Sequence, residues 1–412
     1  MVSAAPIPFE RALAEARAHG QPRAWRRPLG GPPAAADEVF AWLRDAADDG
    51  TLAAARARLR VYNAAGPLEV RPAHYPRPHD ATIAGWLARL GADHGECGVV
   101  VNNLQAASPA AWRAALALLA LLHRERAPVG GASFDLFTGA YRRGFFGVHK
   151  DDQDVVTFVV EGHKRFYLWP FERFAERPGA PATELGVHLL TDLDPAPHLA
   201  DALVLEGGPG DVFYWPAEWW HLAASDGELC TTVGVGLFRG HSVLRFAEEA
   251  AQRRIEEDPA AFADALALPS PAAGGDATAA LTAADAAVDA LLADDELRAR
   301  LAERVLASAS AFGCGRLPAP RRDPLPAGPL RLAAPGALPW TARGGELVWA
   351  VGGEAARYPD LPPLRALFAR VGAGAPFVAD DLARELADPS VAADALRHVL
   401  ARIHAHHGLV PA

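Results

Sequence analysis

The chain has 412 residues, half of them hydrophobic, and its net charge of −10 comes from 50 acidic and 40 basic side chains. This length allows roughly two to three domains with a sizeable core. The acidic balance argues against a nucleic-acid partner, which would require a basic patch. The cysteines Cys97, Cys230 and Cys314 lie too far apart for a disulfide framework or a CxxC metal site, as in a reducing compartment.

The sequence also shows no signal for export or membrane insertion. Residues 1–8 lack the basic start and the apolar run of a signal peptide. The most apolar segment, residues 114–122, has about half the length that a membrane helix needs. We therefore expect a cytoplasmic protein with no membrane partner.

Residues 1–95 predict a mostly helical region that packs on the core. Within 82–90, four apolar residues recur at helical spacing: Ile83, Trp86, Leu87 and Leu90. Further helices are expected at 9–18, 38–47 and 109–124, and strands at 58–63 and 98–103.

Residues 96–242 contain short β runs punctuated by Gly and Pro. Such a pattern is typical of an antiparallel sandwich or barrel, of which a jelly roll is one form. The expected strands are 133–137, 155–160, 165–169, 203–205, 211–215 and 229–237.

Helical patterns return after residue 243, so the predicted fold class is α+β. Residues 243–315 predict a helical region in which 283–307 form one helix with an apolar stripe. The proline-rich stretch 316–329 is a predicted linker. The remaining residues, 330–412, predict a small winged-helix-like domain with a strand at 346–351 and helices at 364–371, 380–386 and 391–404.

His149 and Asp151 are the first candidates for chemistry. Side chains two residues apart on a strand point to the same side, so an imidazole and a carboxylate would converge on one point. An HxD triplet also arises by chance on solvated turns. Here the pair precedes the apolar run 155–160, which favours the mouth of a barrel over an outer loop.

His221 supplies a second imidazole at the end of the stretch GDVFYWPAEWWH, residues 210–221. The Trp-Pro turn in this stretch places His221 at the start of a new strand that faces the first. An interface histidine stacked among tryptophans is the alternative. Two histidines and one carboxylate with open positions form the facial triad that holds non-haem Fe(II).

Lys164 follows a predicted chain reversal at residues 161–162. Alternation along the next strand groups Lys164 with Phe166 and Leu168 on one face. An ammonium on an apolar inner face is costly unless an anion pairs with it, so an anionic ligand is a candidate partner. An exposed lysine on the outer wall is the alternative, and Arg165 is an alternative residue for the same role.

The strings HKD, EGHKRFYLWP and GDVFYWPAEWWH resemble those of the JmjC-type Fe(II)/2-oxoglutarate oxygenases of the cupin superfamily. The resemblance covers about 132–237 and is greatest to the ribosomal oxygenases and to the asparaginyl hydroxylase that acts on the hypoxia-inducible factor. It implies a double-stranded β-helix core and a metal triad of His149, Asp151 and His221. It also implies that Lys164, fifteen residues after His149, binds 2-oxoglutarate.

The resemblance further implies a dioxygenase that uses Fe(II), 2-oxoglutarate and O2 to hydroxylate a protein or peptide side chain, rather than to demethylate it. Ser133 and Thr138 are candidates for the polar residue that the family places near the far carboxylate of 2-oxoglutarate. Because the helical region of ribosomal oxygenases dimerises, we expect a homodimer through residues 243–315. Substrate is expected near Trp219 and Trp220.

Other functions are compatible with the same residues. The same chemistry could act on a ribosomally made peptide or a small metabolite in a biosynthetic pathway. A non-oxygenase metal-binding cupin, such as an isomerase, would leave Lys164 without a cosubstrate to hold. A cupin-fold binding protein without catalysis would not need the triad. Titration of the Fe(II) protein with 2-oxoglutarate separates the oxygenases from the last two.

Overall fold

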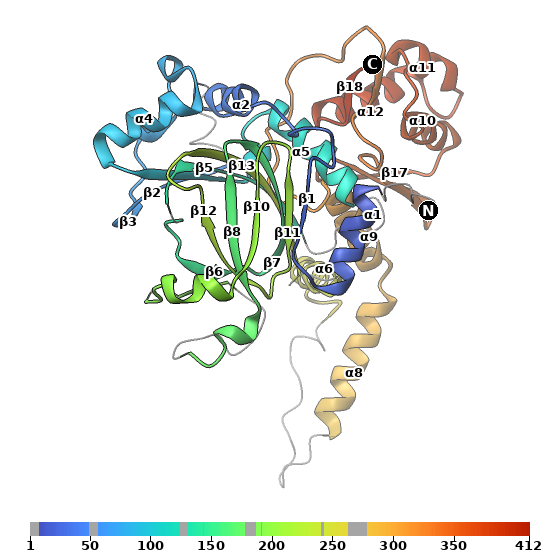
Figure 1. Ribbon diagram of the computed structural model, residues 1–412. Helices are drawn as coiled ribbons and strands as arrows, with labels where there is room; N and C mark the ends of the chain where they lie inside the picture. Colours follow the sequence, from blue (N-terminus) through green and yellow to red (C-terminus); the bar gives the residue numbers. More distant parts are fainter. Residues whose placement is uncertain are drawn as a thin grey trace, which may run out of the picture. The chain divides into compact units, whose positions relative to one another are not determined.

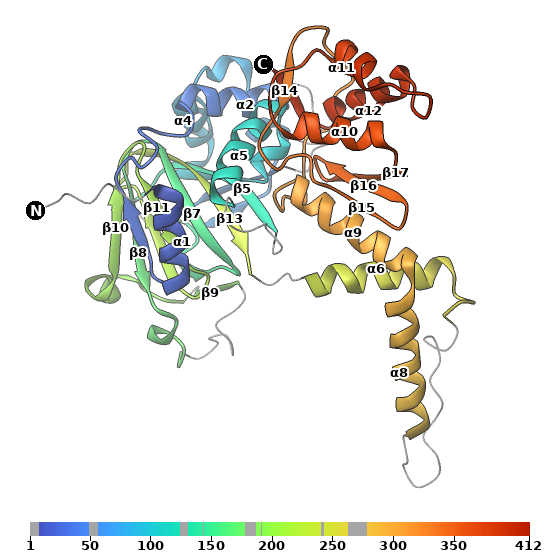
Figure 2. The ribbon, with the colours of Figure 1, turned by 90° about the vertical axis from the view of Figure 1, so that its right-hand side faces the viewer.

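The computed structural model describes residues 8–48, 57–123, 131–142, 144–177, 187–190, 192–239, 243–262 and 278–412. The chain divides into two compact units, residues 1–240 with 312–320 and residues 241–311 with 321–412. Figures 1 and 2 show the helices and strands of both units. The division into four segments that the sequence suggests stays a prediction. Among the residues described, no helix is long and apolar enough to cross a membrane.

The first unit is built on two antiparallel sheets. The larger contains, in spatial order, β1 (Arg23–Trp25), β11 (Val212–Trp215), β7 (Gln153–Glu161), β13 (Leu229–Phe238), β5 (Ala132–Ala140), β4 (Cys97–Asn102), β2 (Arg58–Asn63) and β3 (Gly66–Leu68). The smaller contains β10 (Leu203–Gly207), β8 (Lys164–Trp169), β12 (Trp220–Ala224), β6 (Val148–Lys150) and β9 (His188–Leu190).

These sheets form the predicted jelly roll. Strands β11, β7, β13 and β5 lie in one wall, and β10, β8, β12 and β6 lie in the other (Figure 1). The α+β fold class with a double-stranded β-helix core is therefore confirmed. The apolar run 155–160 is buried throughout in β7, which lies inside the larger sheet between β11 and β13.

The chain reverses between β7 and β8 at Gly162, as the sequence predicts. Gly162 has a φ of +75°, and a Cβ at this position would lie 2.0 Å from the carbonyl oxygen of Leu229. Only glycine combines this backbone conformation with so close an approach. This turn brings Lys164 back toward the strand that precedes it.

Helices cover the first unit: α1 (Phe9–His19), α2 (Ala36–Asp48), α4 (Ile83–His94) and α5 (Pro109–Leu122). The four apolar residues expected on one face of α4 are all buried. Thr82 begins α4 by accepting a hydrogen bond from the Gly85 N–H at 3.0 Å. Strand β1 was not predicted. Its three residues show no alternation, and an ion pair between Arg26 and Asp211 fixes the chain just beyond it.

The second unit combines helices with two small sheets. The helices are α6 (Val243–Glu257), α8 (Thr278–Ala293), α9 (Asp295–Ser310), α10 (Pro362–Gly372), α11 (Ala379–Leu386) and α12 (Ala393–Ala405). Strands β15 (Trp340–Arg343), β16 (Glu346–Val351) and β17 (Glu354–Pro359) form one antiparallel sheet, and β14 (Leu330–Leu332) pairs with β18 (Leu409–Pro411).

The prediction of a single helix over 283–307 is wrong. Asp294 is extended and separates α8 from α9. Its carboxylate accepts a hydrogen bond from the Leu297 N–H at 2.6 Å, which satisfies a donor at the start of α9. The local capping preference of this aspartate thus prevails over the continuous apolar stripe.

Candidate active site

The side chains of His149, Asp151 and His221 converge on one point on the smaller sheet. Their potential ligand atoms all lie within 4.8 Å of one another. Oδ2 of Asp151 is 3.6 Å from Nε2 of His221, and the two imidazole centroids are 4.1 Å apart. Within the described parts of the chain, no other group of three or more His, Cys, Asp or Glu side chains meets this criterion.

Strand register explains the convergence. His149 in β6 and His221 in β12 are direct cross-strand partners, so their side chains share one face. Asp151 follows β6 immediately and projects to the same side as His149. A turn in which the Trp219 N–H donates to the Pro216 carbonyl at 3.0 Å carries the chain from β11 into β12. The predicted Trp-Pro turn therefore delivers His221 to the start of its strand.

Backbone contacts and burial of the triad side chains favour the protonation states that can bind a metal ion. The Nδ1 atoms of His149 and His221 lie 3.1 Å and 3.5 Å from the carbonyls of Gly147 and Trp219. A proton on each Nδ1 donates to these oxygens and leaves each Nε2 with a lone pair. Burial, together with the neighbouring His149, lowers the pKa of His221 well below its usual value. Burial raises the pKa of Asp151, and a bound cation would oppose this by stabilising its charge.

Lys164 lies on the inner face of β8, where alternation predicts it. It is buried and lines the same cavity as Phe166, whereas Arg165 pairs outside with Glu206 and Asp226. Nζ of Lys164 donates to the hydroxyl of Tyr141 at 2.5 Å. In the described residues no carboxylate forms an ion pair with Lys164. Burial alone would lower the pKa of Lys164, but the Tyr141 oxygen and the Cys230 sulfur oppose it and the net shift is upward.

Tyr141 is a site residue that sequence reasoning missed. The predicted strand ends at 137, which assigns Tyr141 to a loop, but β5 continues to Ala140 and brings Tyr141 under Lys164. Its ring centroid lies 4.8 Å from the Lys164 ammonium. The hydroxyl and the ring together hold the ammonium in place.

Ser133 and Thr138 have different environments. The Ser133 hydroxyl donates to Asp135 at 2.7 Å and does not line the cavity. Thr138 lines the cavity, with its hydroxyl 2.9 Å from that of Thr231. Neither hydroxyl is hydrogen-bonded to Lys164, and a cosubstrate role for either residue stays a prediction.

A family model described as the JmjC domain matches residues 132–245. This segment contains the triad, Lys164 and Tyr141. Residues 132–245 form a JmjC domain. The match confirms the predicted resemblance and the enzyme class that accompanies it, a 2-oxoglutarate-dependent oxygenase, and the His–Asp–His donor set agrees with Fe(II) as its metal.

Solved structures of YcfD from Escherichia coli are similar over nearly the whole chain. One is 15% identical and covers 93% of this chain and 94% of its own, with a TM-score of 0.57. Two others are described as YcfD, a ribosomal oxygenase, with cobalt and succinic acid or with cobalt and 2-oxoglutarate. They are 15% and 16% identical, cover 95% of this chain and 94% of their own, and have TM-scores of 0.56 and 0.54. At this identity the likeness shows the fold. No curated protein matches.

The cavity of the JmjC domain has a volume of about 270 Å³ and is lined by the triad, Lys164, Tyr141 and Asp135. Several side chains of its wall are polar. Three buried oxygens on this wall have no hydrogen-bond partner within the described structure: Asn102 Oδ1, Gln153 Oε1 and Thr232 Oγ1. Buried polar atoms without partners are rare, so these oxygens indicate a surface that a ligand completes.

Trp219 and Trp220 do not line the cavity, and the expectation that substrate lies near them stays a prediction. Trp220 is fully buried in a separate apolar cluster with Trp169 and Phe174. The indole N–H of Trp219 donates to the Gly20 carbonyl at 3.3 Å. Trp215 lines the JmjC cavity instead, because its position in β11 directs its ring toward Phe166.

The donor set of the JmjC domain fits the predicted metal and cosubstrate. Two imidazoles and one carboxylate suit Fe(II), which accepts nitrogen and oxygen ligands from a facial triad. Lys164 is a buried cation in the same cavity, where it can pair with one carboxylate of a small dicarboxylate. The metal triad that would bind one end of 2-oxoglutarate and the ammonium that would bind the other end therefore lie in one cavity.

Proposed function

We propose that this JmjC oxygenase hydroxylates a side chain of a protein or peptide. The observation that carries the proposal is a single cavity shared by the His149–Asp151–His221 triad and the buried Lys164 ammonium. A buried cation without a carboxylate partner requires an anion, and a metal triad with open positions accepts a chelating ligand. 2-Oxoglutarate meets both requirements because it has a carboxylate at each end.

The residues of the chain have separate roles in binding the metal, binding the cosubstrate and excluding water. When bound, Fe(II) and 2-oxoglutarate supply the oxidising chemistry with O2, and succinate and CO2 are the coproducts. His149, Asp151 and His221 hold the metal and leave other positions open to ligands. Lys164, fixed by Tyr141, receives the far carboxylate of the cosubstrate. Apolar side chains such as Phe137, Val155 and Trp215 limit the access of water to the cavity.

A protein substrate is supported by the similarity to YcfD, which is described as a ribosomal oxygenase. A ribosomal protein is therefore the first candidate. To test this, the protein is incubated with Fe(II), 2-oxoglutarate, air and isolated ribosomal proteins. Succinate formation that depends on the added protein, with a mass gain of one oxygen atom in one of its peptides, is the expected result. Succinate formation stimulated only by a small metabolite would contradict it.

Polar side chains on the cavity wall restrict which kind of substrate side chain can bind there. Asp135 lies there, fixed by the Ser133 hydroxyl at 2.7 Å and by the Asn103 N–H at 2.8 Å, next to the unpaired oxygen of Asn102. Burial raises the pKa of Asp135, and these hydrogen bonds oppose the rise. A side chain that donates hydrogen bonds would satisfy these acceptors, whereas an apolar side chain would leave them buried and unpaired.

Replacement of Asp135 by asparagine is expected to lower kcat/KM for the protein substrate about tenfold, because one acceptor oxygen becomes a donor. The KM for 2-oxoglutarate is expected to stay unchanged, since Asp135 makes no contact with Lys164. Steady-state kinetics with each substrate varied in turn measures both values. Equal kcat/KM values for the protein substrate in Asp135→Asn and wild-type enzyme would exclude Asp135 from recognition.

We also propose that the protein is a homodimer. On α8, Leu281, Val288 and Leu292 lie on one helical face and are 65%, 54% and 60% exposed. A second copy of the chain would cover this face symmetrically. Light scattering is expected to give twice the chain mass, and Val288→Lys is expected to reduce it to one chain. A single-chain mass for the unaltered protein would remove the proposal.

A further inference from the structure

A turn outside the active-site cavity holds the main chain of Tyr141. This turn, residues 225–228, joins β12 to β13. Ser225 is buried, and its hydroxyl accepts from the Tyr141 N–H at 3.2 Å and donates to the Tyr141 carbonyl at 3.0 Å. The same carbonyl accepts from the backbone N–H groups of Ser225 and Gly227, at 3.2 and 3.3 Å. Both hydrogen-bonding groups of the Tyr141 backbone are thus occupied by one turn.

The same turn reaches the strand that carries Lys164. Oδ1 of Asp226 accepts from Nη1 of Arg165 at 3.0 Å, and Arg165 directly follows Lys164 in β8. Two partners therefore converge on this turn: Tyr141, which contacts Lys164 through its hydroxyl, and Arg165, which shares the backbone of Lys164.

Two glycines without side chains leave space for the Tyr141 ring. Gly139 in β5 lies opposite Gly98 in β4. A Cβ on Gly139 would lie 2.9 Å from ring carbons of Tyr141 and 2.9 Å from the Cα of Gly98. The ring of Phe145 packs against Tyr141 at a centroid distance of 5.5 Å. Only a residue without a side chain leaves room for the ring at this position.

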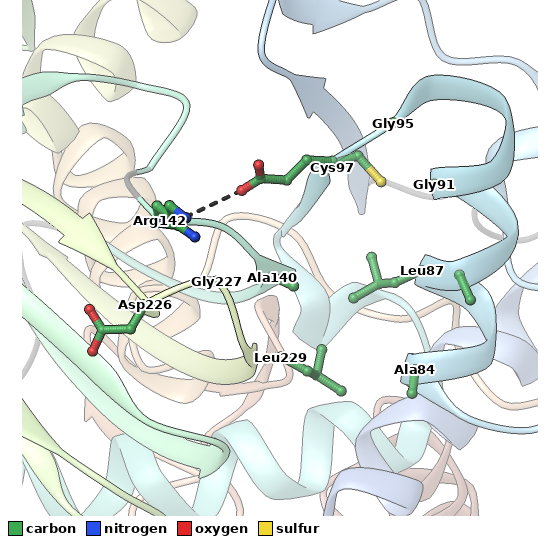
Figure 3. A pocket seen from close by; sticks show the side chains of 12 residues that line it. Ala84, Leu87, Gly91, Gly95, Cys97, Ala140, Arg142, Asp226, Gly227 and Leu229 are labelled. Carbon is green, nitrogen blue, oxygen red and sulfur yellow. Dashed lines mark hydrogen bonds between the residues drawn. The ribbon is translucent and has the colours of Figure 1, made fainter.

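Figure 3 shows the surroundings of the turn at a second cavity. Asp226 and Gly227 lie beside Ala140 and Arg142, at the edge of a second cavity of about 570 Å³. The dashed line marks the hydrogen bond from the Arg142 N–H to the Glu96 carboxylate, at 3.3 Å. No residue of the turn lines the cavity that contains the triad. The turn can therefore influence the cosubstrate only through the residues that it holds.

We propose that Ser225 is a positioning residue for the cosubstrate. It fixes the backbone of Tyr141, Tyr141 fixes the ammonium of Lys164, and Lys164 receives the far carboxylate of 2-oxoglutarate. This inference rests on the proposed function, because it requires 2-oxoglutarate at Lys164. The affinity for 2-oxoglutarate thus depends on a hydroxyl that does not touch it.

The test measures 2-oxoglutarate binding without turnover, by calorimetric titration of the protein loaded with Mn(II). Ser225→Ala is expected to raise the Kd about threefold to tenfold, because Lys164 loses part of its fixed position. The affinity for Mn(II) is expected to stay unchanged, and so is kcat at saturating 2-oxoglutarate with Fe(II). Tyr141→Phe is expected to raise the Kd by itself, and Ser225→Ala is expected to add nothing in that background.

Ser310→Ala is the matched control. Ser310 is also buried, donates to a carbonyl (Ala307, 2.9 Å) and accepts from a distant N–H (Gly353, 3.0 Å), but it belongs to the second unit. Its Kd for 2-oxoglutarate is expected to equal that of the wild type. If Ser225→Ala does not fold, Asp226→Ala serves instead, since this side chain is half exposed, and it too should raise the Kd.

The outcomes separate this inference from the function on which it rests. A wild-type protein that binds no 2-oxoglutarate overturns the proposed function. Normal wild-type binding with an unchanged Kd in Ser225→Ala, or in Asp226→Ala when that variant replaces it, overturns the role of the turn alone. Additive effects of Ser225→Ala and Tyr141→Phe would also overturn it, because they would show that the turn does not act through the tyrosine hydroxyl.

Discussion

Alanine at His149, Asp151 or His221 is expected to lower kcat/KM at least about 100-fold. Loss of a residue that only orients a metal ligand already costs about 10- to 100-fold in metal affinity or activity, and loss of a ligand itself removes more. The three potential ligand atoms lie within 4.8 Å of one another, so each variant leaves an incomplete triad. Succinate formation gives the rate, and the iron content after dialysis shows whether the metal is lost with it.

His188→Ala is the control for the loss of a histidine on the smaller sheet. His188 lies in β9 opposite Lys150 of β6, and its side chain does not line the cavity. Its iron content and rate are expected to match those of the wild type. Full turnover in any of the three triad variants would contradict the assignment of that residue as a ligand.

Lys164→Met is expected to raise the KM for 2-oxoglutarate about 10- to 100-fold. A hydrogen bond to a charged group contributes about 1.5–3 kcal/mol, which corresponds to this range. Methionine keeps a long apolar side chain among Phe166 and Tyr141 and therefore limits the structural damage. The measurement is the initial rate as a function of 2-oxoglutarate concentration, at a fixed concentration of the protein substrate.

Arg165→Met provides the comparison, since Arg165 is adjacent in sequence but faces outward to Glu206 and Asp226. We expect its KM for 2-oxoglutarate to rise by no more than the about threefold to tenfold that is expected for the Kd of Ser225→Ala. A larger effect at Arg165 than at Lys164 would transfer the role of cosubstrate anchor to Arg165.

Much of the first unit could be predicted because its signals are local. The apolar run in β7, the apolar face of α4 and the glycine reversal at Gly162 each lie within a few residues of sequence. Strand β1 could not be found in this way, since pairing in the larger sheet holds its three residues and a distant aspartate holds Arg26 just beyond them. Asp294 is a capping residue and so marks the break between α8 and α9 in the sequence, but the prediction of one helix gave more weight to the longer apolar stripe.

The site residues likewise comprise some with a local sequence signal and some without one. His149 and Asp151 lie two residues apart, and His221 ends a recognisable string, so the triad could be read from the sequence. The link between Tyr141 and Ser225 could not, because hydrogen bonds to the backbone join residues 84 positions apart and leave no pattern in the residue types. The positions of Trp219 and Trp220 also depend on packing, which places Trp220 in a separate core.

The most direct test of the central claim is an anaerobic titration of the Fe(II) protein with 2-oxoglutarate. If the triad holds the iron and the cosubstrate chelates it, a visible charge-transfer band appears and saturates. The band is expected to be absent in His149→Ala and to require more 2-oxoglutarate in Lys164→Met. No band in the wild-type protein, with no succinate formed after air is admitted, would contradict the assignment as a 2-oxoglutarate-dependent oxygenase.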